Sequence, residues 1–255
     1  MATKTLKTIP KISVKIWQPI IDKLDEKLKT ACLRRDAYLS KVLEVELDRL
    51  DEEVSIPNSQ ASYDYVFTRI YQLHPKPVSL ALPSELTARL NEICSRKRIV
   101  RDAFFNRVFL LLAASPKAID TLLFGDVGSK WRTDVWSENK HDGPFFQNGF
   151  YPLEPMIDPF WAIRSGLEMY ANDAGLEDYV EPTSGKSIRV TRDIITGAVL
   201  PADSLYTTIF EQKVLGNDLL GLSCYLPDWR IPGQGAKQQH DAKLDELLAD
   251  LGNLP

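Results

Sequence analysis

The sequence predicts a mainly α-helical protein with short strands, of the α+β class, in which two tandem strand–helix–helix units precede a mixed C-terminal domain of unknown fold. Three observations lead to this prediction. Apolar and polar residues alternate over two short segments, 11–16 and 77–82, which is typical of a half-buried strand. Apolar residues then recur at helical spacing, over 20–28 and 37–45 after the first segment and over 86–94 and 103–111 after the second. Residues 116–255 repeat neither pattern and are rich in Pro and Gly loop signals.

Length and composition are those of a globular protein. The chain has 255 residues, of which 44% are hydrophobic and 26% charged, enough for one large domain or two small ones. No apolar run reaches the roughly 18 residues of a membrane span, and the basic N-terminus lacks the apolar segment of a signal peptide. The three cysteines have no disulfide or zinc-site spacing, so we expect a reducing, cytoplasmic location.

The charge is distributed unevenly along the chain. Residues 1–41 carry 10 Lys or Arg and 4 Asp or Glu, and residues 76–107 carry 7 and 3. Residues 42–75 are net acidic, and residues 108–255 carry 12 basic and 21 acidic side chains. An overall charge of −4 would by itself argue against a nucleic-acid-binding protein. Two basic blocks in an acidic chain instead indicate a local anionic partner.

The two basic blocks also resemble each other in sequence. A shift of 66 residues aligns 12–44 with 78–110 without a gap. The identical pairs are Ser13/Ser79, Leu24/Leu90, Arg35/Arg101, Asp36/Asp102, Ala37/Ala103 and Val42/Val108. The shared Arg-Asp-Ala-aromatic segment indicates that one supersecondary unit occurs twice.

Each unit is expected to fold as a strand followed by two helices. In the first strand Ile12, Val14 and Ile16 form the apolar face, which leaves Lys11, Ser13 and Lys15 on the other side. A proline near the start of each following helix, at positions 19 and 83, suits a first helical turn. Breaks near 32–34 and 98–100 separate this helix from the second one.

The segment VSLALPSELTARLNEICSRKRIVRDAFFNRVF resembles the ribbon-helix-helix DNA-binding proteins of the CopG, MetJ and Arc type. The resemblance covers about residues 10–50 and 76–114 and implies tandem ribbon-helix-helix units. In that family two antiparallel strands enter the major groove of double-stranded DNA, and the N-terminus of the second helix contacts phosphates. The implied base-reading residues are Lys11, Ser13, Lys15, Ser79 and Ala81. The implied phosphate contacts are Arg34, Arg35 and Arg101.

The sequence departs from the family pattern between the two helices. The family often has Gly in this turn and Ser or Thr at the second helix cap, whereas this chain has Cys32-Leu33-Arg34 and Arg98-Ile99-Val100. Asp36 and Asp102 are then the candidates for capping the second helices. The second strand has no charged outward residue, so weaker or purely steric base reading is expected from it.

Five segments are expected along the chain. They are a first unit at 1–51, a packed aromatic-rich spacer at 52–75, a second unit at 76–115, an acidic interaction domain at 116–232, and a linker with a short amphipathic helix at 233–255. In the acidic domain we expect helices at 159–172 and 203–216 and a strand at 187–191. Strand 11–16 could pair with strand 77–82 of the same chain, or like strands could pair between two chains of a homodimer.

Catalytic and metal-binding motifs are absent from the sequence: there is no phosphate-binding loop, no G-x-G-x-x-G, no H-E-x-x-H and no C-x-x-C. We therefore expect no enzyme activity, no metal and no cofactor. The first hypothesis is a site-specific transcriptional regulator that binds double-stranded DNA, and we expect it to be a homodimer. The second is a DNA-tethered interaction protein, such as an antitoxin or an accessory factor in plasmid partition or transfer, that acts on a protein partner through its C-terminal half.

Overall fold

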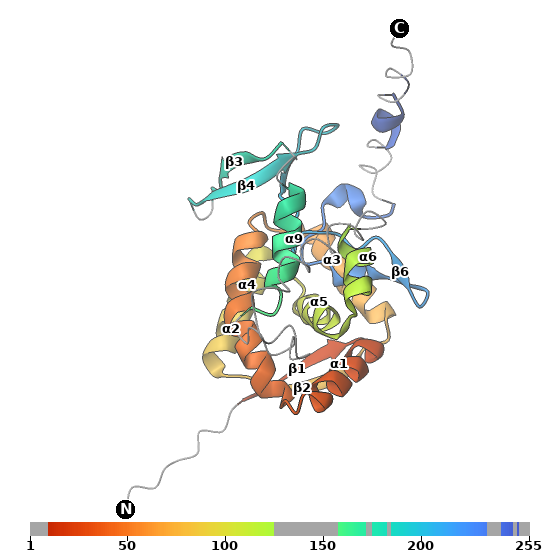
Figure 1. Cartoon of the computed structure of the whole chain (residues 1–255). Coiled ribbons are helices and arrows are strands. Elements are labelled where there is room, and N and C mark those ends of the chain that lie inside the picture. Colours follow the sequence, from red (N-terminus) through yellow and green to blue (C-terminus); the bar gives the residue numbers. More distant parts are fainter. Residues whose placement is uncertain are drawn as a thin grey trace, which may run out of the picture.

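The computed structural model of the chain is a mixed α+β fold in which helices predominate and the strands form small antiparallel sheets (Figure 1). The structure describes residues 10–124, 158–171, 175–182, 185–233, 241–246 and 249. Helix α5 lies at the centre of the molecule. In the view of Figure 1 the β1–β2 ribbon lies below α5 and the β3–β4 hairpin lies above it.

The first unit consists of β1 (Lys11–Ile16), α1 (Gln18–Thr30) and α2 (Arg35–Glu53). Val14 and Ile16 are completely buried whereas Lys11 and Ser13 are exposed, so the alternation in the sequence gives β1 one apolar face. Pro19 stands in the first turn of α1, where the missing N–H removes no helical hydrogen bond.

The second unit repeats this order with β2 (Lys76–Ala81), α4 (Ser84–Lys97) and α5 (Arg101–Ala113). The spacer between the units contains helix α3 (Gln60–Gln72), which begins where the Ser59 side chain accepts a hydrogen bond from the N–H of Ser62. Val66 and Ile70 of α3 are buried in the core. The expectation of a packed spacer is therefore confirmed.

The two units interlock within the single chain. β1 and β2 pair antiparallel, with Ser13 opposite Ser79 at the middle of the ribbon. Helix α1 of the first unit packs on α5 of the second, and α2 of the first packs on α4 of the second. Of the two strand pairings left open by the sequence, the structure contains the one within the chain.

The C-terminal half contributes short elements that lie against the two units. They are α6 (Pro116–Phe124), α9 (Trp161–Ala171), β3 (Glu177–Val180), β4 (Ser187–Arg192), β5 (Val199–Pro201), β6 (Lys213–Val214), β7 (Asn217–Asp218) and the 3₁₀ helices η3 (Leu219–Leu222) and η4 (Asp228–Arg230). The expected helix near 159–172 and strand near 187–191 are confirmed as α9 and β4.

The expected helix over 203–216 is wrong, because this segment consists of turns followed by β6. Its buried side chains Leu205, Tyr206 and Phe210 have a spacing that resembles a helical face. The backbone instead finds other partners: the Thr207 hydroxyl accepts the N–H of Ser204 at 2.8 Å, and the N–H of Tyr206 donates to Glu53 at 2.9 Å. Such local side-chain bonds compete with helix formation.

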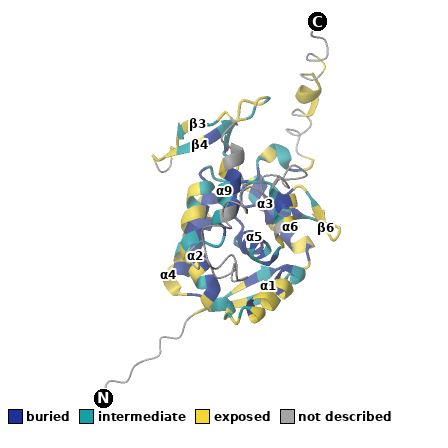
Figure 2. Ribbon diagram, in the orientation of Figure 1, coloured by how far each residue is buried: buried dark blue, intermediate teal, exposed yellow. Residues whose placement is uncertain are grey.

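One hydrophobic core runs through both halves of the described chain (Figure 2). Arg107 of α5 shows how closely they join: it is completely buried, and its guanidinium donates to the carbonyls of Leu205 and Thr208, both at 2.7 Å. It also lies 4.0 Å from the ring centre of Phe210. The described residues of 116–232 thus share a core with the two units, and an independent domain over 116–232 stays a prediction.

Only part of the expected C-terminal amphipathic helix lies within the described residues. Residues 241–246 are helical, and Leu244 is 41% exposed. Leu247, Leu248 and Leu251, which would complete its apolar face, lie outside the described residues. In the part of the chain that the structure describes, no helix is both long and apolar enough to cross a membrane.

Candidate nucleic-acid interface

The outer face of the β1–β2 ribbon brings together all five residues that the sequence suggested for base reading. Directly opposite residues of an antiparallel pair point to the same side, and Lys11 pairs with Ala81, Ser13 with Ser79, and Lys15 with Pro77. Lys11, Ser13 and Ser79 are exposed, and Lys15 and Ala81 are half-buried. The opposite face packs on the core through Val14 and Leu80, both completely buried.

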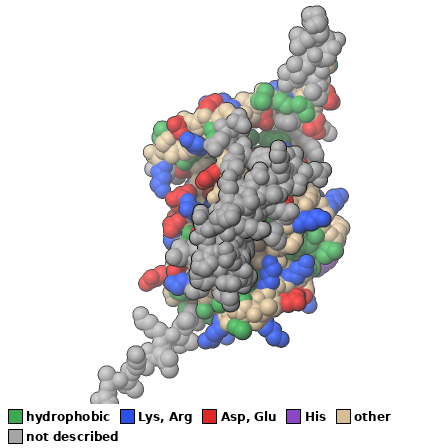
Figure 3. All heavy atoms as spheres, viewed as in Figure 1, with side chains coloured by type: hydrophobic (Ala, Val, Ile, Leu, Met, Phe, Trp, Pro, Cys, Tyr) green, Lys and Arg blue, Asp and Glu red, His purple; other side chains and the backbone are tan. Residues whose placement is uncertain are grey.

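Basic side chains gather around the ribbon. Figure 3 shows Lys and Arg side chains, with some Asp and Glu side chains among them, along the lower edge of the molecule, where Figure 1 places β1, β2 and α1. The charge is unequal between the strands, because the outward positions of β1 carry two lysines whereas those of β2 carry Pro77, Ser79 and Ala81. The ribbon therefore has a pseudo-twofold backbone with an asymmetric surface.

Lys15 does not extend freely from the ribbon. Its ammonium donates to the hydroxyl of Tyr71 at 2.9 Å and lies 4.0 Å from the centre of the same ring. Tyr71 lies at the end of α3, just before β2. Helix α3 thus lies beside one end of the ribbon, and its Tyr71 binds one of the two outward lysines.

The repeated arginines contact the ribbon itself rather than projecting from it. Arg35 of the first unit donates to the carbonyl of Ser79 at 3.3 Å, and Arg101 of the second donates to the carbonyl of Ser13 at 3.1 Å. Each arginine thus crosses to the strand of the other unit. Arg34, the other candidate for phosphate binding, is exposed at the N-cap of α2.

The repeated aspartates complete these contacts. Asp36 accepts the N–H of Ala81 at 3.1 Å, and Asp102 faces the backbone N–H of Lys15. Burial raises the pKa of Asp102, and this N–H opposes part of the rise. The expected capping role is therefore wrong: the N-caps are Arg34 and Val100, which make no side-chain cap bond. The Arg-Asp repeat acts as a reciprocal clamp between each second helix and the opposite strand.

The turn between the two helices of each unit contains one residue in the left-handed conformation. Cys32 and Arg98, which are equivalent in the repeat, have φ values of 57° and 50°. This left-handed conformation is unfavourable for residues with a Cβ. At Arg98 the fold supplies compensating bonds, since Asn58 donates to its carbonyl at 3.1 Å and the Arg98 guanidinium donates to the Asn58 carbonyl at 3.0 Å. These two bonds help to hold the turn of the second unit in this conformation.

Asn106 is a positioning residue that the sequence analysis missed. It is completely buried in α5, accepts the N–H of Trp17 and donates to the carbonyl of Lys15, both at 2.8 Å. These bonds hold the end of β1, where the strand turns into α1. The available signal was that Asn106 and Arg107 interrupt the otherwise apolar run Phe104–Leu112, because buried polar side chains are almost always hydrogen-bonded.

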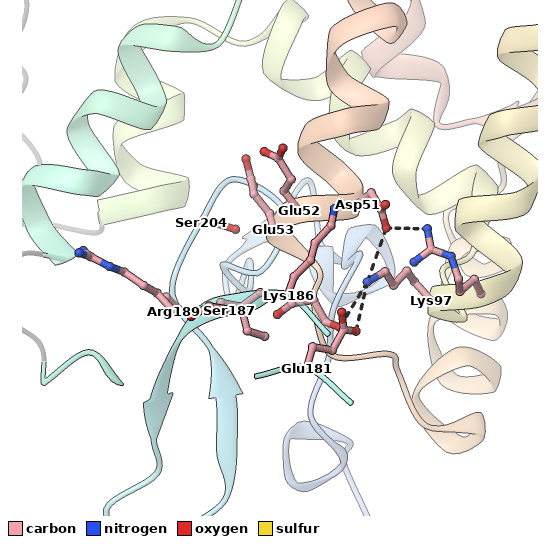
Figure 4. Close-up of a pocket in the computed structure, with 13 residues that line it drawn as sticks. Asp51, Glu52, Glu53, Lys97, Glu181, Lys186, Ser187, Arg189 and Ser204 are labelled. Atoms are coloured by element: carbon pink, nitrogen blue, oxygen red, sulfur yellow. Dashed lines mark hydrogen bonds and ion pairs between the residues drawn. The ribbon is translucent and has the colours of Figure 1, made fainter. Parts of the chain in front are cut away.

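A concave region of about 450 Å³ lies away from the ribbon, between the ends of α2 and α4 and the strand β4 (Figure 4). The Lys97 ammonium lies 3.4 Å from the carboxylate of Glu181 and 3.5 Å from that of Asp51, which also pairs with Arg96 at 2.8 Å. Lys97 and Glu181 are almost completely buried. The charges compensate one another, so the region joins the second unit to the β3–β4 hairpin.

Comparisons with protein-family models, with curated proteins and with solved structures found no match to the chain. Within the described segments, no group of three or more His, Cys, Asp or Glu side chains could hold a metal ion. The ribbon and its surroundings are accordingly interpreted from their geometry and charge.

Proposed function

We propose that the protein is a site-specific regulator that binds double-stranded DNA and reads the major groove with the β1–β2 ribbon, as a ribbon-helix-helix protein with both units in one chain. The observation that carries the proposal is the exposed outer face on which Lys11, Ser13 and Ser79 lie together above a buried apolar face. A two-stranded ribbon fits the major groove, and short polar side chains with lysines are suited to base edges.

The proposal assigns different tasks to the basic residues. Lys11 and Lys15 contact bases, and Ser13, Ser79 and Ala81 form the rest of the base-reading surface. Arg34 contacts a phosphate from the exposed N-terminus of α2, where free N–H groups also favour an anion. Arg35 and Arg101 keep the ribbon in register through the carbonyls of Ser79 and Ser13. Arg35 also pairs with Asp25 at 3.2 Å, and a phosphate bound by Arg35 would replace that carboxylate.

In the same proposal the protein has a binding role and not a catalytic one. It also includes a cytoplasmic location, which the free thiols of Cys32, Cys94 and Cys224 favour. Because Lys11 and Lys15 have no charged counterparts on β2, one chain is expected to read an asymmetric site. A homodimer of such chains would read two copies of that site related by twofold symmetry.

Selection of bound sequences from a random pool of duplex DNA tests the proposal. The expected result is an enriched asymmetric motif, or an inverted pair of such motifs for a homodimer. Lys11→Ala should reduce the preference for the motif over random DNA. Arg34→Ala should weaken binding to all sequences and lower the salt slope by about 1.

The matched control is Lys117→Ala, which removes an exposed positive charge from α6, outside the ribbon. If this variant loses as much affinity as Lys11→Ala, the effect is one of overall charge and the ribbon is not the reading surface. Failure to enrich any motif at moderate salt would remove the proposal.

The second candidate is a DNA-tethered protein that acts mainly on a partner protein. The C-terminal half exposes large apolar side chains at Ile194, Leu215 and Leu244, which are 93%, 75% and 41% exposed. Copurification of a stoichiometric partner that is lost on Leu215→Ala or Leu244→Ala, with DNA binding unchanged, would favour this candidate.

A further inference from the structure

Three aromatic side chains of α3, Tyr63, Phe67 and Tyr71, form what we call the aromatic stripe. The ring centres of Tyr63 and Phe67 are 6.3 Å apart with planes inclined by 13°, and those of Phe67 and Tyr71 are 4.9 Å apart. Phe67 is 42% and Tyr71 40% exposed. Residues four apart share one helix face, so the stripe presents ring surface to solvent over about two turns.

Cations stand at both ends of the aromatic stripe. At one end the ammonium of Lys15 lies over the Tyr71 ring. At the other end, Tyr63 lines an open cavity of about 460 Å³ together with Arg98 and Arg101. Two of these cations also belong to the ribbon's surroundings, since Lys15 is in β1 and Arg101 bonds to the carbonyl of Ser13.

Carboxylates contribute little to this surface. On α3 itself the acidic side chain beside the stripe is Asp64, which accepts a hydrogen bond from Gln60 at 2.9 Å. Across the cavity the residues from α4 are Asn91, Cys94 and Ser95, none of them acidic. The surface is therefore aromatic along its length and positive at its ends.

We propose that the aromatic stripe and its flanking cations bind an unpaired strand of DNA. Single-stranded nucleic acid is bound where aromatic rings stack on bases and cations follow the backbone. Duplex DNA cannot use the rings in this way, because its bases are stacked inside the helix. A second copy of the chain, placed stripe to stripe, would bring Lys15 and Arg101 against the same cations, so charge complementarity favours a polyanion.

This inference goes beyond the proposed reading of duplex DNA and does not depend on it. The stripe adjoins one end of the ribbon, so both surfaces can be occupied at once at a junction between duplex and single strand. The two surfaces share Lys15 and Arg101, but the three aromatic rings belong to the stripe alone, so substituting a ring measures the contribution of the stripe separately.

The test is fluorescence anisotropy of the full chain at low salt with three probes. They are a blunt duplex of arbitrary sequence, the same duplex with a tail of about 10 thymidines, and free oligothymidine of that length, which is within the usual site size. Phe67→Leu removes the ring and keeps the apolar character, and Phe67→Trp restores a ring. Leu215→Ala is the matched control, since Leu215 is an exposed apolar residue of the β6–β7 turn.

Phe67→Leu is expected to weaken binding of oligothymidine and of the tailed duplex by about fivefold or more, equivalent to about 1 kcal/mol. Binding of the blunt duplex should not change, and Phe67→Trp and Leu215→Ala should bind all probes as the native protein does. If blunt duplex fails to bind while oligothymidine binds through Phe67, the inference holds and the proposed function fails.

Two results would overturn the inference. The first is that the native protein does not bind oligothymidine, or that Phe67→Leu binds it as tightly as the native protein does. The other is concentration-dependent self-association that Phe67→Leu abolishes in sedimentation experiments, because the occupant of the stripe would then be a second copy of this chain.

Discussion

Replacing Arg164 of α9 with Met should destabilise the protein strongly. The guanidinium bonds to both oxygens of Glu46, at 2.8 and 3.0 Å, and to Glu53 at 2.8 Å and Asp158 at 3.0 Å. The side chain of Arg164 is 11% exposed and that of Glu46 is completely buried. Removing one partner of a buried pair costs about 3–5 kcal/mol, because the other charge stays buried and uncompensated.

The loss should also depend on pH. Burial raises the pKa of Glu46 even beside Arg164, and without the guanidinium the pKa rises further. A folded-state pKa above the unfolded one means that the folded protein is penalised at high pH, and that the penalty vanishes below the ordinary glutamate pKa. The deficit of Arg164→Met relative to the native protein should therefore shrink as the pH falls from 7 toward that value.

Urea unfolding followed by the fluorescence of the five tryptophans measures the free energy of unfolding. The matched control is Arg192→Met, which breaks a 2.7 Å pair with Glu177 whose side chains are about half exposed and should cost less than about 1 kcal/mol. In the double variant Glu46→Gln, Arg164→Met no charge remains unpaired at position 46, so it should be more stable than Arg164→Met alone by about 0.5–3 kcal/mol.

The reasoning fails if Arg164→Met costs no more than Arg192→Met. It also fails if the double variant is no more stable than the single one, because the loss would then come from packing rather than from an uncompensated charge.

Three further predictions follow from the fold. Asp36→Ala should lower the free energy of unfolding by about 1–3 kcal/mol in urea experiments, because the N–H of Ala81 loses its acceptor. A thiol reagent at pH 8 should modify exposed Cys32 in the native protein and leave two thiols unmodified, since burial raises the pKa of Cys94 and Cys224 to about 12. The protons retained by these thiols stabilise the fold below their ordinary pKa, and this stabilisation is lost as the pH rises toward 12. Gly221→Ala should cost about 1–3 kcal/mol in thermal unfolding, because an added Cβ would lie 3.0 Å from a side-chain atom and 3.1 Å from a backbone atom of α3.

Two of these predictions have a matched control variant. Glu44→Ala removes an exposed carboxylate from the same helix as Asp36 and should change stability by less than about 0.5 kcal/mol. The control for Gly221→Ala is Gly197→Asn, which should change stability little. Gly197 has a φ of 68° and open space around it, and Asn tolerates this conformation. Equal labelling rates for Cys32 and Cys94 would contradict the burial of Cys94, and a neutral Gly221→Ala would contradict the close packing of η3 on α3.

Much of the ribbon could be predicted from the sequence. Alternation over 11–16 and 77–82 identified both strands and their outward faces to within one residue, because a strand with one buried face must alternate. The 66-residue repeat identified the second unit for the same reason, since equivalent patterns of burial require equivalent residues. The unequal charge of the two strands could be predicted at once from Lys11 and Lys15.

The roles of the repeated Arg-Asp pairs could not be predicted in this way. Periodicity tells which side of an element is buried, but not which distant groups meet there. Arg35 and Asp36 reach the backbone of a strand more than 40 positions away in the sequence, and only the crossing of the two units brings these groups together. The same limit applied to 203–216, where bonds to Glu53 and within the turn replaced the expected helix.

The sequence by itself therefore determined the elements of the two units, their charge and their outward faces, because these depend on local patterns of burial. Only the tertiary structure decided that the strands pair within the chain, that Tyr71 holds Lys15, and that Arg107 and Arg164 bind the C-terminal half into the same core. Each of these contacts joins residues that are far apart in the chain, and their partners are selected by packing and by the need to satisfy buried polar groups.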